Sequence, residues 1–396
     1  MITDPFTLVG DLLREFLIGL GLKAPEASGV IAFLGAGALA TAVLVLCFLL
    51  IWAERKILAR IQDRIGPNRV GPFGLLQTVA DFAKLLTKEV VVPSGADKLL
   101  YFLAPPLAVM AVVGLWAVIP LAPNLVGTDI NVALIYLISI GAIGTLAIML
   151  AGWSSNNKYA LLGAFRSVAM LISYEVPMVL ALLVPTMLAG SMGTVAIVEA
   201  QRQMWFVVLA PLAAILFFTS SMAEAGKAPF DLLEAESEIV AGYNIEYSSM
   251  AFGMFFVGDF LHGFTLSALT VTLFFGGWLG PYVDQYSWLG LIYFLAKTAV
   301  VYFAVIWIRG TLPRLRIDQV NAFNWKFLVP LALSVVVVTA VADKAAATLG
   351  WDRTLALFVA NGLLLLGTVI ALQLYARSQR RRFERTSLAA APAPAR

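Results

Sequence analysis

Long runs of apolar residues, separated by short polar segments, make up most of the chain. A helix needs about 20 apolar residues to cross the hydrocarbon core of a bilayer. Runs of roughly that length occupy residues 30–53, 99–121, 132–152, 168–188, 205–223, 249–278, 288–308, 327–342 and 354–375. The pattern therefore predicts an all-α fold, a polytopic membrane helical bundle with about nine transmembrane helices.

Two other segments have apolar residues on one helical face only. The first is the N-terminal segment, residues 1–29. The second lies within loop 54–98, where apolar side chains share one face and Asp81 and Lys84 share another. Such patterns are typical of amphipathic helices that lie on a membrane surface. A solvated surface helix with an Asp81–Lys84 pair is the alternative interpretation.

Successive transmembrane helices place the loops alternately on the two sides of the membrane, and the basic residues are distributed unevenly between these sides. Apart from Lys297, which falls inside a span, one side holds only Arg14, Lys23, Arg202, Lys344 and Arg353 of the 27 Lys and Arg residues. The other side holds all the rest, in loops 54–98, 153–167, 224–248 and 309–326 and in the tail 377–396. Because cytoplasmic loops carry the excess of Lys and Arg, we expect the N-terminus outside and the C-terminus in the cytoplasm.

The same reasoning divides the chain into three parts. An amphipathic segment (1–29) precedes a transmembrane bundle (30–376) with its cytoplasmic loops. A basic C-terminal tail (377–396) follows. Its last residues are rich in alanine and proline, and we expect the tail to be disordered.

The composition limits the chemistry that this chain can perform alone. It is 61% hydrophobic and contains one cysteine, Cys47, and one histidine, His262. An iron–sulfur cluster normally needs about four thiolate ligands, and a bis-histidine haem needs two imidazoles. We therefore expect this chain to bind no haem or iron–sulfur cluster, and its partners to carry any electrons. We also expect no bound flavin and no metal site.

One polar stretch, residues 224–246, lies between two apolar runs and concentrates acidic residues. It contains Glu224, Asp231, Glu234, Glu236, Glu238 and Glu246 against one base, Lys227. Asp231, Glu234 and Glu238 would share one helical face, and like charges so close raise the pKa of some carboxyls. These are candidate proton acceptors. A capping box from Asp231 to Glu234 and a solvated acidic loop are the alternatives.

Four acidic or basic residues fall within predicted spans. They are Glu175, Asp259, His262 and Lys297. A charge inside a membrane is costly and usually marks an ion or substrate path. The sequence therefore predicts a buried polar path. The alternative is a structural Asp259–Lys297 pair that joins two helices.

Four blocks of sequence resemble those of a known family. They are ERKILARIQDRIGPNRVGPFGLLQTVADFAKLLTKE (54–89), WSSNNKYALLGAFRSVAMLISYEV (153–176), APFDLLEAESEIVAGYNIEYS (228–248) and WIRGTLPRLRIDQ (307–319). They resemble the H subunit of NADH–quinone oxidoreductase, the quinone-channel membrane subunit of respiratory complex I. The resemblance covers about residues 30–345. It leaves out the N-terminal segment, the ninth span and the tail.

The resemblance implies a membrane subunit of a proton-pumping enzyme in the bacterial cytoplasmic (inner) membrane. Quinone, the substrate, would enter from the bilayer through a tunnel in this subunit. An iron–sulfur cluster of a peripheral subunit would reduce it at the far end. Acidic residues would relay that reduction to antiporter-like subunits. Small membrane subunits and the lipid bilayer would be further partners, and no nucleic acid is implied.

The resemblance also implies roles for individual residues. The tunnel lining would include Arg64, Phe230, Phe256 and Arg309, to which the residue pattern adds Arg60, four positions before Arg64. The coupling relay would include Glu175, Glu224, Asp231, Glu234, Glu236, Glu238, Glu246 and Asp259, to which the charge pattern adds Lys297. The loops would be anchored by Lys227, Arg314, Arg316 and Asp318.

Three residues depart from the family's pattern. Lys227 stands where arginine is usual, so a two-point contact with a carboxylate is not expected. Asp259 stands where glutamate is usual and reaches one methylene less far. His262 matches no role known for the family, and we expect it to be a hydrogen-bonded residue between helices rather than a ligand.

Two other functions remain open. The first is the equivalent subunit of a membrane-bound hydrogenase or formate–hydrogen lyase, which works without quinone. The second is an autonomous ion transporter. The lack of an internal inverted repeat in the sequence weighs against a transporter.

Overall fold

The computed structural model of the chain describes residues 5–20, 22–232 and 242–390, and these ranges are helical with no β-strand. The helices that precede the acidic loop are α1 (Pro5–Gly19), α2 (Ala24–Ile61), η1 (Pro72–Gly74), α3 (Gln77–Thr87), α4 (Lys98–Leu115), α5 (Ala133–Ser154), α6 (Lys158–Ala189), α7 (Thr194–Ala200), α8 (Phe206–Leu209) and α9 (Pro211–Glu224). Those that follow it are α10 (Ser249–Phe274), α11 (Trp288–Thr311), α12 (Ile317–Phe323), η2 (Asn324–Leu328), α13 (Val329–Leu349) and α14 (Arg353–Ala390). The predicted all-α membrane bundle is confirmed.

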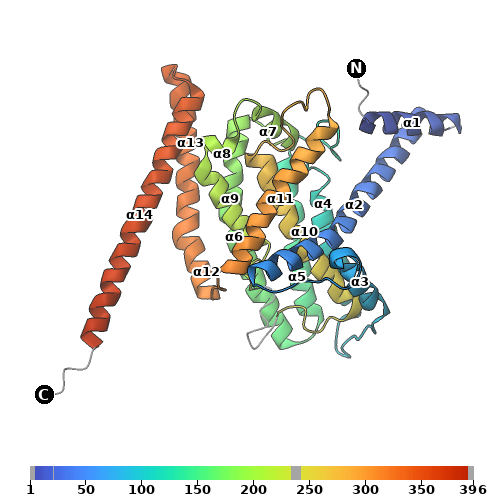
Figure 1. Cartoon of the computed structure of the whole chain (residues 1–396), viewed down its shortest axis with the longest axis horizontal. Coiled ribbons are helices and arrows are strands. Elements are labelled where there is room, and N and C mark those ends of the chain that lie inside the picture. The colour runs from blue at the N-terminus through green and yellow to red at the C-terminus, as the bar shows by residue number, and fades with distance from the viewer. Residues whose placement is uncertain (1–4, 21, 233–241, 391–396) are drawn as a thin grey trace.

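Eight helical segments in the described part of the chain are long and apolar enough to cross a membrane. The fifth predicted span, 205–223, is divided into α8 and α9, because the backbone leaves the helical conformation at Ala210, just before Pro211. The 14 residues of α9 rise about 21 Å, less than the hydrocarbon core of about 30 Å. Helix α1 and the C-terminal end of α14 lie at opposite ends of the bundle (Figure 1).

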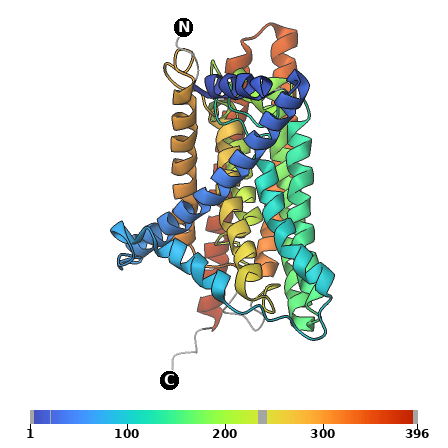
Figure 2. The ribbon, with the colours of Figure 1, turned by 90° about the vertical axis from the view of Figure 1, so that its right-hand side faces the viewer.

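Helix α10 is the centre of the bundle. Most of its membrane-length segment is buried, and it packs against α2, α4, α9 and α11. Figure 2 shows α2 crossing the bundle at a slant, while the other long helices stand nearly parallel. A residue on α10 can therefore face several other helices, which makes this helix the natural position for a buried polar path.

Pro177, inside α6, leaves a backbone carbonyl free to bind the segment that follows α11. Pro177 has no N–H, so the carbonyl four residues earlier, on Ser173, loses its helical partner. Asn324 Nδ2 donates to that carbonyl oxygen at 2.5 Å, and Tyr174 OH donates to the Val320 carbonyl oxygen at 3.1 Å. A helix-breaking residue two positions after Glu175 thus fixes α6 against α12 and η2.

Both predicted amphipathic segments form helices. α1 lies across the direction of the long helices and exposes apolar side chains such as Leu12 and Phe16 (Figure 1). α3 is tied to α2 through Asp81, which accepts from Arg55 Nη1 at 2.6 Å. Burial acts to raise the pKa of Asp81, but the hydrogen bonds from Arg55 and Gln77 outweigh it and lower that pKa. The partner of Asp81 is therefore Arg55, and the Asp81–Lys84 pair of the alternative interpretation is not what holds α3.

The C-terminal segment differs from the prediction. Helix α14 continues to Ala390, through most of the tail 377–396 for which we expected disorder. The alanine and proline signal lies only near the end of that tail, and the residues before it, such as Gln379 and Arg382, are compatible with a helix. Residues 391–396 are outside the described ranges.

Candidate functional site: buried carboxyls beside the acidic loop

The acidic loop begins with a turn that carries a lysine into the bundle. Helix α9 ends at Glu224, and Gly226 follows with a φ of +59°, a conformation that glycine adopts without strain. The turn leaves Lys227 only 2% exposed, with its Nζ donating to Asp259 Oδ2 on α10. The same Nζ lies 4.8 Å from the ring centroid of Phe260. Asp259 is therefore held by one ammonium group, as the substitution of lysine for arginine led us to expect.

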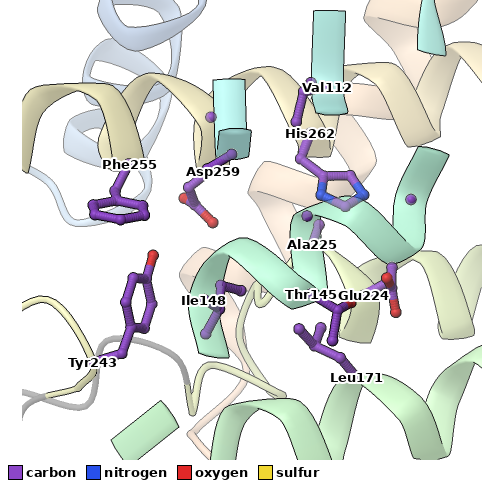
Figure 3. A pocket seen from close by; sticks show the side chains of 14 residues that line it. Val112, Thr145, Ile148, Leu171, Glu224, Ala225, Tyr243, Phe255, Asp259 and His262 are labelled. Atoms are coloured by element: carbon purple, nitrogen blue, oxygen red, sulfur yellow. The ribbon is translucent and has the colours of Figure 1, made fainter. Parts of the chain in front are cut away.

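A small cavity lies next to this pair. Its volume is about 60 Å³, and four of the residues that line it can ionise: Glu224, Tyr243, Asp259 and His262. Figure 3 shows the carboxyls of Asp259 and Glu224 with the His262 ring between them. The side chains come from α9, α10 and the loop before α10, so the fold brings together residues that are distant in the sequence.

A second cavity, of about 40 Å³, continues from the first toward α6. Its lining includes Glu175, and it shares Glu224, His262 and Gly141 with the first cavity. A liquid water occupies about 30 Å³, so the two cavities have room for a few waters and none for a quinone. The structure therefore brings three of the predicted relay residues, Asp259, Glu224 and Glu175, onto one line of water-sized spaces.

Unpaired polar atoms show that these cavities are suited to water. Glu224 Oε2 and Thr145 Oγ1 are buried and have no hydrogen-bond partner among the described residues. Both side chains line the first cavity (Figure 3). Because buried polar atoms in proteins are almost always hydrogen-bonded to protein or to ordered water, water is the partner that fits here.

A second ionic cluster, which the sequence did not lead us to expect, joins α2 to α11. Glu54 is 2% exposed, accepts a hydrogen bond from Tyr302 OH at 2.9 Å and pairs with Nη1 of Arg309. The predicted tunnel residue Arg309 is thus held by a buried carboxylate. Glu54 directly follows the apolar run 30–53, and that position was the only signal in the sequence.

Asp231 and the aromatic residue before it join the acidic loop to the loop after α11. Arg314 Nη2 donates to Asp231 Oδ2 at 2.9 Å. Burial raises the pKa of Asp231, although the nearby Arg314 acts to lower it. Phe230 is buried, with its ring 5.2 Å from that of Tyr174 and 6.4 Å from that of Phe323. Asp231 is therefore a loop-fixing residue in this geometry and does not line either cavity.

Other predicted relay residues lie elsewhere. Glu246 accepts from Asn157 Nδ2 at 2.6 Å and faces a separate surface hollow. Lys297 Nζ donates to the carbonyl oxygens of Phe275, Gly277 and Leu279, about 24 Å of helix rise along α10 from Asp259. The alternative Asp259–Lys297 pair is therefore wrong. Glu234, Glu236 and Glu238 fall within 233–241, outside the described residues.

The remaining predicted residues are at or near the surface. Arg60 and Arg64 are exposed, and Arg64 Nε donates to the neighbouring Gln62. Arg316 and Asp318 form an exposed pair with each other at 2.7 Å. Phe256 is half-buried in a row of rings on α10, 4.7 Å from that of Phe260.

His262 also differs from the expectation. We predicted a hydrogen-bonded residue between helices, but neither ring nitrogen has a hydrogen-bond partner in the described part of the chain, and the ring lines both cavities. Its i, i+3 spacing from Asp259 shows that the two share a helix face. Only the packing of α5, α6 and α9 around that face could show that it borders open space.

Fold and site together define a polytopic α-helical membrane protein that carries acidic groups along internal water-sized cavities. A family model described as NADH dehydrogenase matches residues 35–340. The H subunit of the NADH-quinone oxidoreductase of Dehalococcoides mccartyi is 47% identical over 298 residues, which is 75% of this chain and 83% of the relative. The chain belongs to this family, the H subunits of NADH-quinone oxidoreductases.

Two further relatives give the same result. An H subunit of the NADH-quinone oxidoreductase of Geobacter metallireducens is 50% identical over 75% of this chain and 92% of its own length. The H subunit of the Rhodospirillum centenum enzyme is 44% identical over 76% and 91%. The family match includes the Lys227–Asp259 pair and both cavities, and it leaves out α1 and α14.

Proposed function

We propose that this chain is the membrane subunit of a proton-pumping NADH–quinone oxidoreductase that admits quinone from the bilayer and couples its reduction to proton movement. The family membership supports the parent enzyme, because its relatives carry the name of the H subunit. The observation that carries the coupling role is the pair of cavities, which places Asp259, Glu224 and Glu175 on one internal path.

The path has the chemistry that proton movement needs. Carboxyl groups separated by a few waters can exchange protons along hydrogen bonds, whereas apolar side chains cannot. Glu224 is the central group, since it lines both cavities and has an oxygen without a protein partner among the described residues. A change of charge at one end of the path can therefore be passed to the other end.

The quinone side of the proposal rests on aromatic and basic residues. An isoprenoid tail needs an apolar passage, and Phe230 and Phe256 supply aromatic walls on the loop and on α10. Arg309 supplies a fixed positive charge, with Arg60 and Arg64 at the exposed end of α2. Reduction of quinone to quinol takes up two electrons, from an iron–sulfur cluster in a peripheral subunit, and two protons.

The proposal also sets the surroundings of the chain. Peripheral quinone-site subunits would dock on the side that carries loops 54–98 and 309–326, with small membrane and antiporter-like subunits around the bundle. The N-terminus would be outside and the C-terminus in the cytoplasm of a bacterial cell. The distribution of basic residues supports this orientation.

Replacement of Glu224 by glutamine tests the coupling role. The intact complex would be purified and reconstituted into vesicles. In Glu224→Gln, NADH–quinone turnover and proton uptake should fall together by about tenfold or more, because the central carboxyl can no longer carry a proton. NADH oxidation by ferricyanide, which does not use quinone, should stay unchanged.

The matched control is Ser220→Ala, which removes a buried polar atom from the same helix without touching either cavity. It should pump like the unaltered complex. Full pumping by Glu224→Gln would contradict the coupling role. Loss of the ferricyanide reaction as well would show failed assembly, and a milder Glu224→Asp variant would then be compared.

A further inference from the structure

His262 occupies the point where the two cavities meet. It lies on α10, three positions after Asp259, and its ring lines the first cavity together with Asp259 and the second together with Glu175. Glu224 borders both cavities as well. In Figure 3 the ring stands between the carboxyls of Asp259 and Glu224. A single side chain thus faces both water-sized spaces.

The ring is available for water. Neither nitrogen has a hydrogen-bond partner within the described ranges, and the half-buried ring borders both cavities. The ammonium group of Lys227 is held on Asp259 and on the face of Phe260. An imidazole that borders two cavities, each of which also contains a carboxyl group in an otherwise largely apolar lining, can hydrogen-bond to water on each side.

The charged and titratable groups around His262 come from every element packed at this point. Asp259 shares its helix face, and Glu224 approaches from α9, with Lys227 in the turn that follows. Glu175 faces the second cavity from α6, and Tyr243 faces the first from the loop before α10. Acids therefore lie in both cavities that the ring borders, and Lys227, the base at this point among the described residues, is paired with Asp259.

We propose that His262 carries protons between the cavity beside Asp259 and the cavity beside Glu175, so that it is a residue of the coupling path. One ring nitrogen accepts a proton from water on one side, and the other nitrogen releases its proton to water on the opposite side. The imidazole is neutral before and after this step, and its tautomer is restored by rotation of the ring or by transfer in the reverse sense. The inference rests on the proposed coupling function.

This role follows from the shape of the imidazole. The two nitrogens of imidazole flank one ring carbon, but the N–H of one and the lone pair of the other point in diverging directions, so a neutral ring donates on one side and accepts on the other. The ring can therefore exchange protons with two separate groups of waters at once. Glu224 also borders both cavities. A proton that His262 releases into the second cavity can therefore pass through water to Glu224 or to Glu175.

The test compares His262→Gln with Glu224→Gln in the purified complex, reconstituted into vesicles. Glutamine keeps hydrogen-bonding atoms and removes the titratable ring. We expect NADH–quinone turnover and proton uptake to fall about tenfold in His262→Gln. The ratio of the rate in H₂O to that in D₂O should rise, because proton transfer then limits turnover. The ferricyanide reaction should be unchanged.

Two further variants separate a proton carrier from a packing residue. His262→Glu places another titratable group at the same point and should recover part of the turnover and the normal isotope ratio. Ser267→Ala removes a buried polar atom from the same helix, away from both cavities, and should resemble the unaltered complex. A normal rate and isotope ratio in His262→Gln, with a slow Glu224→Gln, would overturn this inference alone. Normal rates in both variants would overturn the coupling function as well.

Discussion

Two lysines are held at separate sites along α10, and their surroundings differ. Lys227 meets the carboxylate of Asp259, beside a cavity with three other ionisable groups. Lys297 instead donates to three backbone carbonyls just past the end of α10, at 2.9, 3.1 and 2.7 Å. Its ammonium also lies 4.6 Å from the ring centroid of Trp205. The cavity next to Lys297 is larger, about 480 Å³, and its exposed lining is apolar.

The difference shows that a charge inside a membrane protein does not by itself mark a proton path. Carbonyl oxygens do not titrate, and a cation near a helix C-terminus is stabilised by the partial negative charge there. Lys297 is thus a cap for α10. Lys227 faces a group that can gain or lose a proton and that borders water-sized space. A functional charge is recognised by its partner and its access to water.

The largest effect is expected at the Lys227 site. In Lys227→Met, Asp259 loses its counter-charge inside the bundle, which typically costs about 3 kcal/mol of stability. Quinone-linked pumping should fall as well, because the Lys227–Asp259 pair beside the first cavity is broken. Thermal inactivation of the purified complex and proton uptake by vesicles measure the two losses. Lys227→Arg keeps the charge and is the control. Normal pumping by Lys227→Met would show that the pair has no part in coupling.

A smaller effect, of a different kind, is expected at the Lys297 site. Lys297→Met removes three hydrogen bonds from carbonyl oxygens and should cost about 2 kcal/mol of stability. Turnover and the number of protons moved per NADH should stay normal, because no titratable path reaches this point. Thermal inactivation and vesicle pumping test both statements. Lys344→Met, which removes an exposed positive charge, is the control. Reduced proton stoichiometry in Lys297→Met would restore Lys297 to the relay.

The contrast between the two lysine sites also explains what could be predicted from the sequence. Hydrophobic run lengths report helices directly, so the spans were predictable, including the short segment that became α9. The partners of charged residues depend on contacts between distant segments. Glu54 and Arg309 are 255 positions apart, and Lys227 reaches Asp259 only because of the turn at Gly226. The sequence therefore identifies the charged residues of the site. Which of them line a cavity depends on how the helices pack, and this could not be predicted from the sequence.

A third, smaller effect is expected in the pH dependence of stability, at Asp231 in the acidic loop. The pKa of Asp231 is raised above its ordinary value of 3.8, so the folded protein holds this proton more tightly than the unfolded chain. The contribution of Asp231 to stability is therefore complete below pH 3.8 and is lost as the pH rises through the raised value. The Asp231→Asn variant should not lose this stability as the pH rises. Near neutral pH, its free energy of unfolding should differ from that of the unaltered protein by less than about 1 kcal/mol. Parallel curves of thermal inactivation against pH for the two proteins would contradict this.

The smallest effect is expected where a charge pair is fully at the surface. The side chains of Arg316 and Asp318 are 76% and 60% exposed, and water and salt weaken their attraction. Arg316→Gln should therefore leave thermal inactivation and pumping unchanged. Arg314→Gln, two positions away, should lower the inactivation temperature, because Arg314 is less exposed and holds Asp231. If the two variants had the same inactivation temperature, the burial of a charge pair would not determine its contribution to stability in this loop. The comparison of the two lysine sites, which also relies on the surroundings of each charge, would then be weakened.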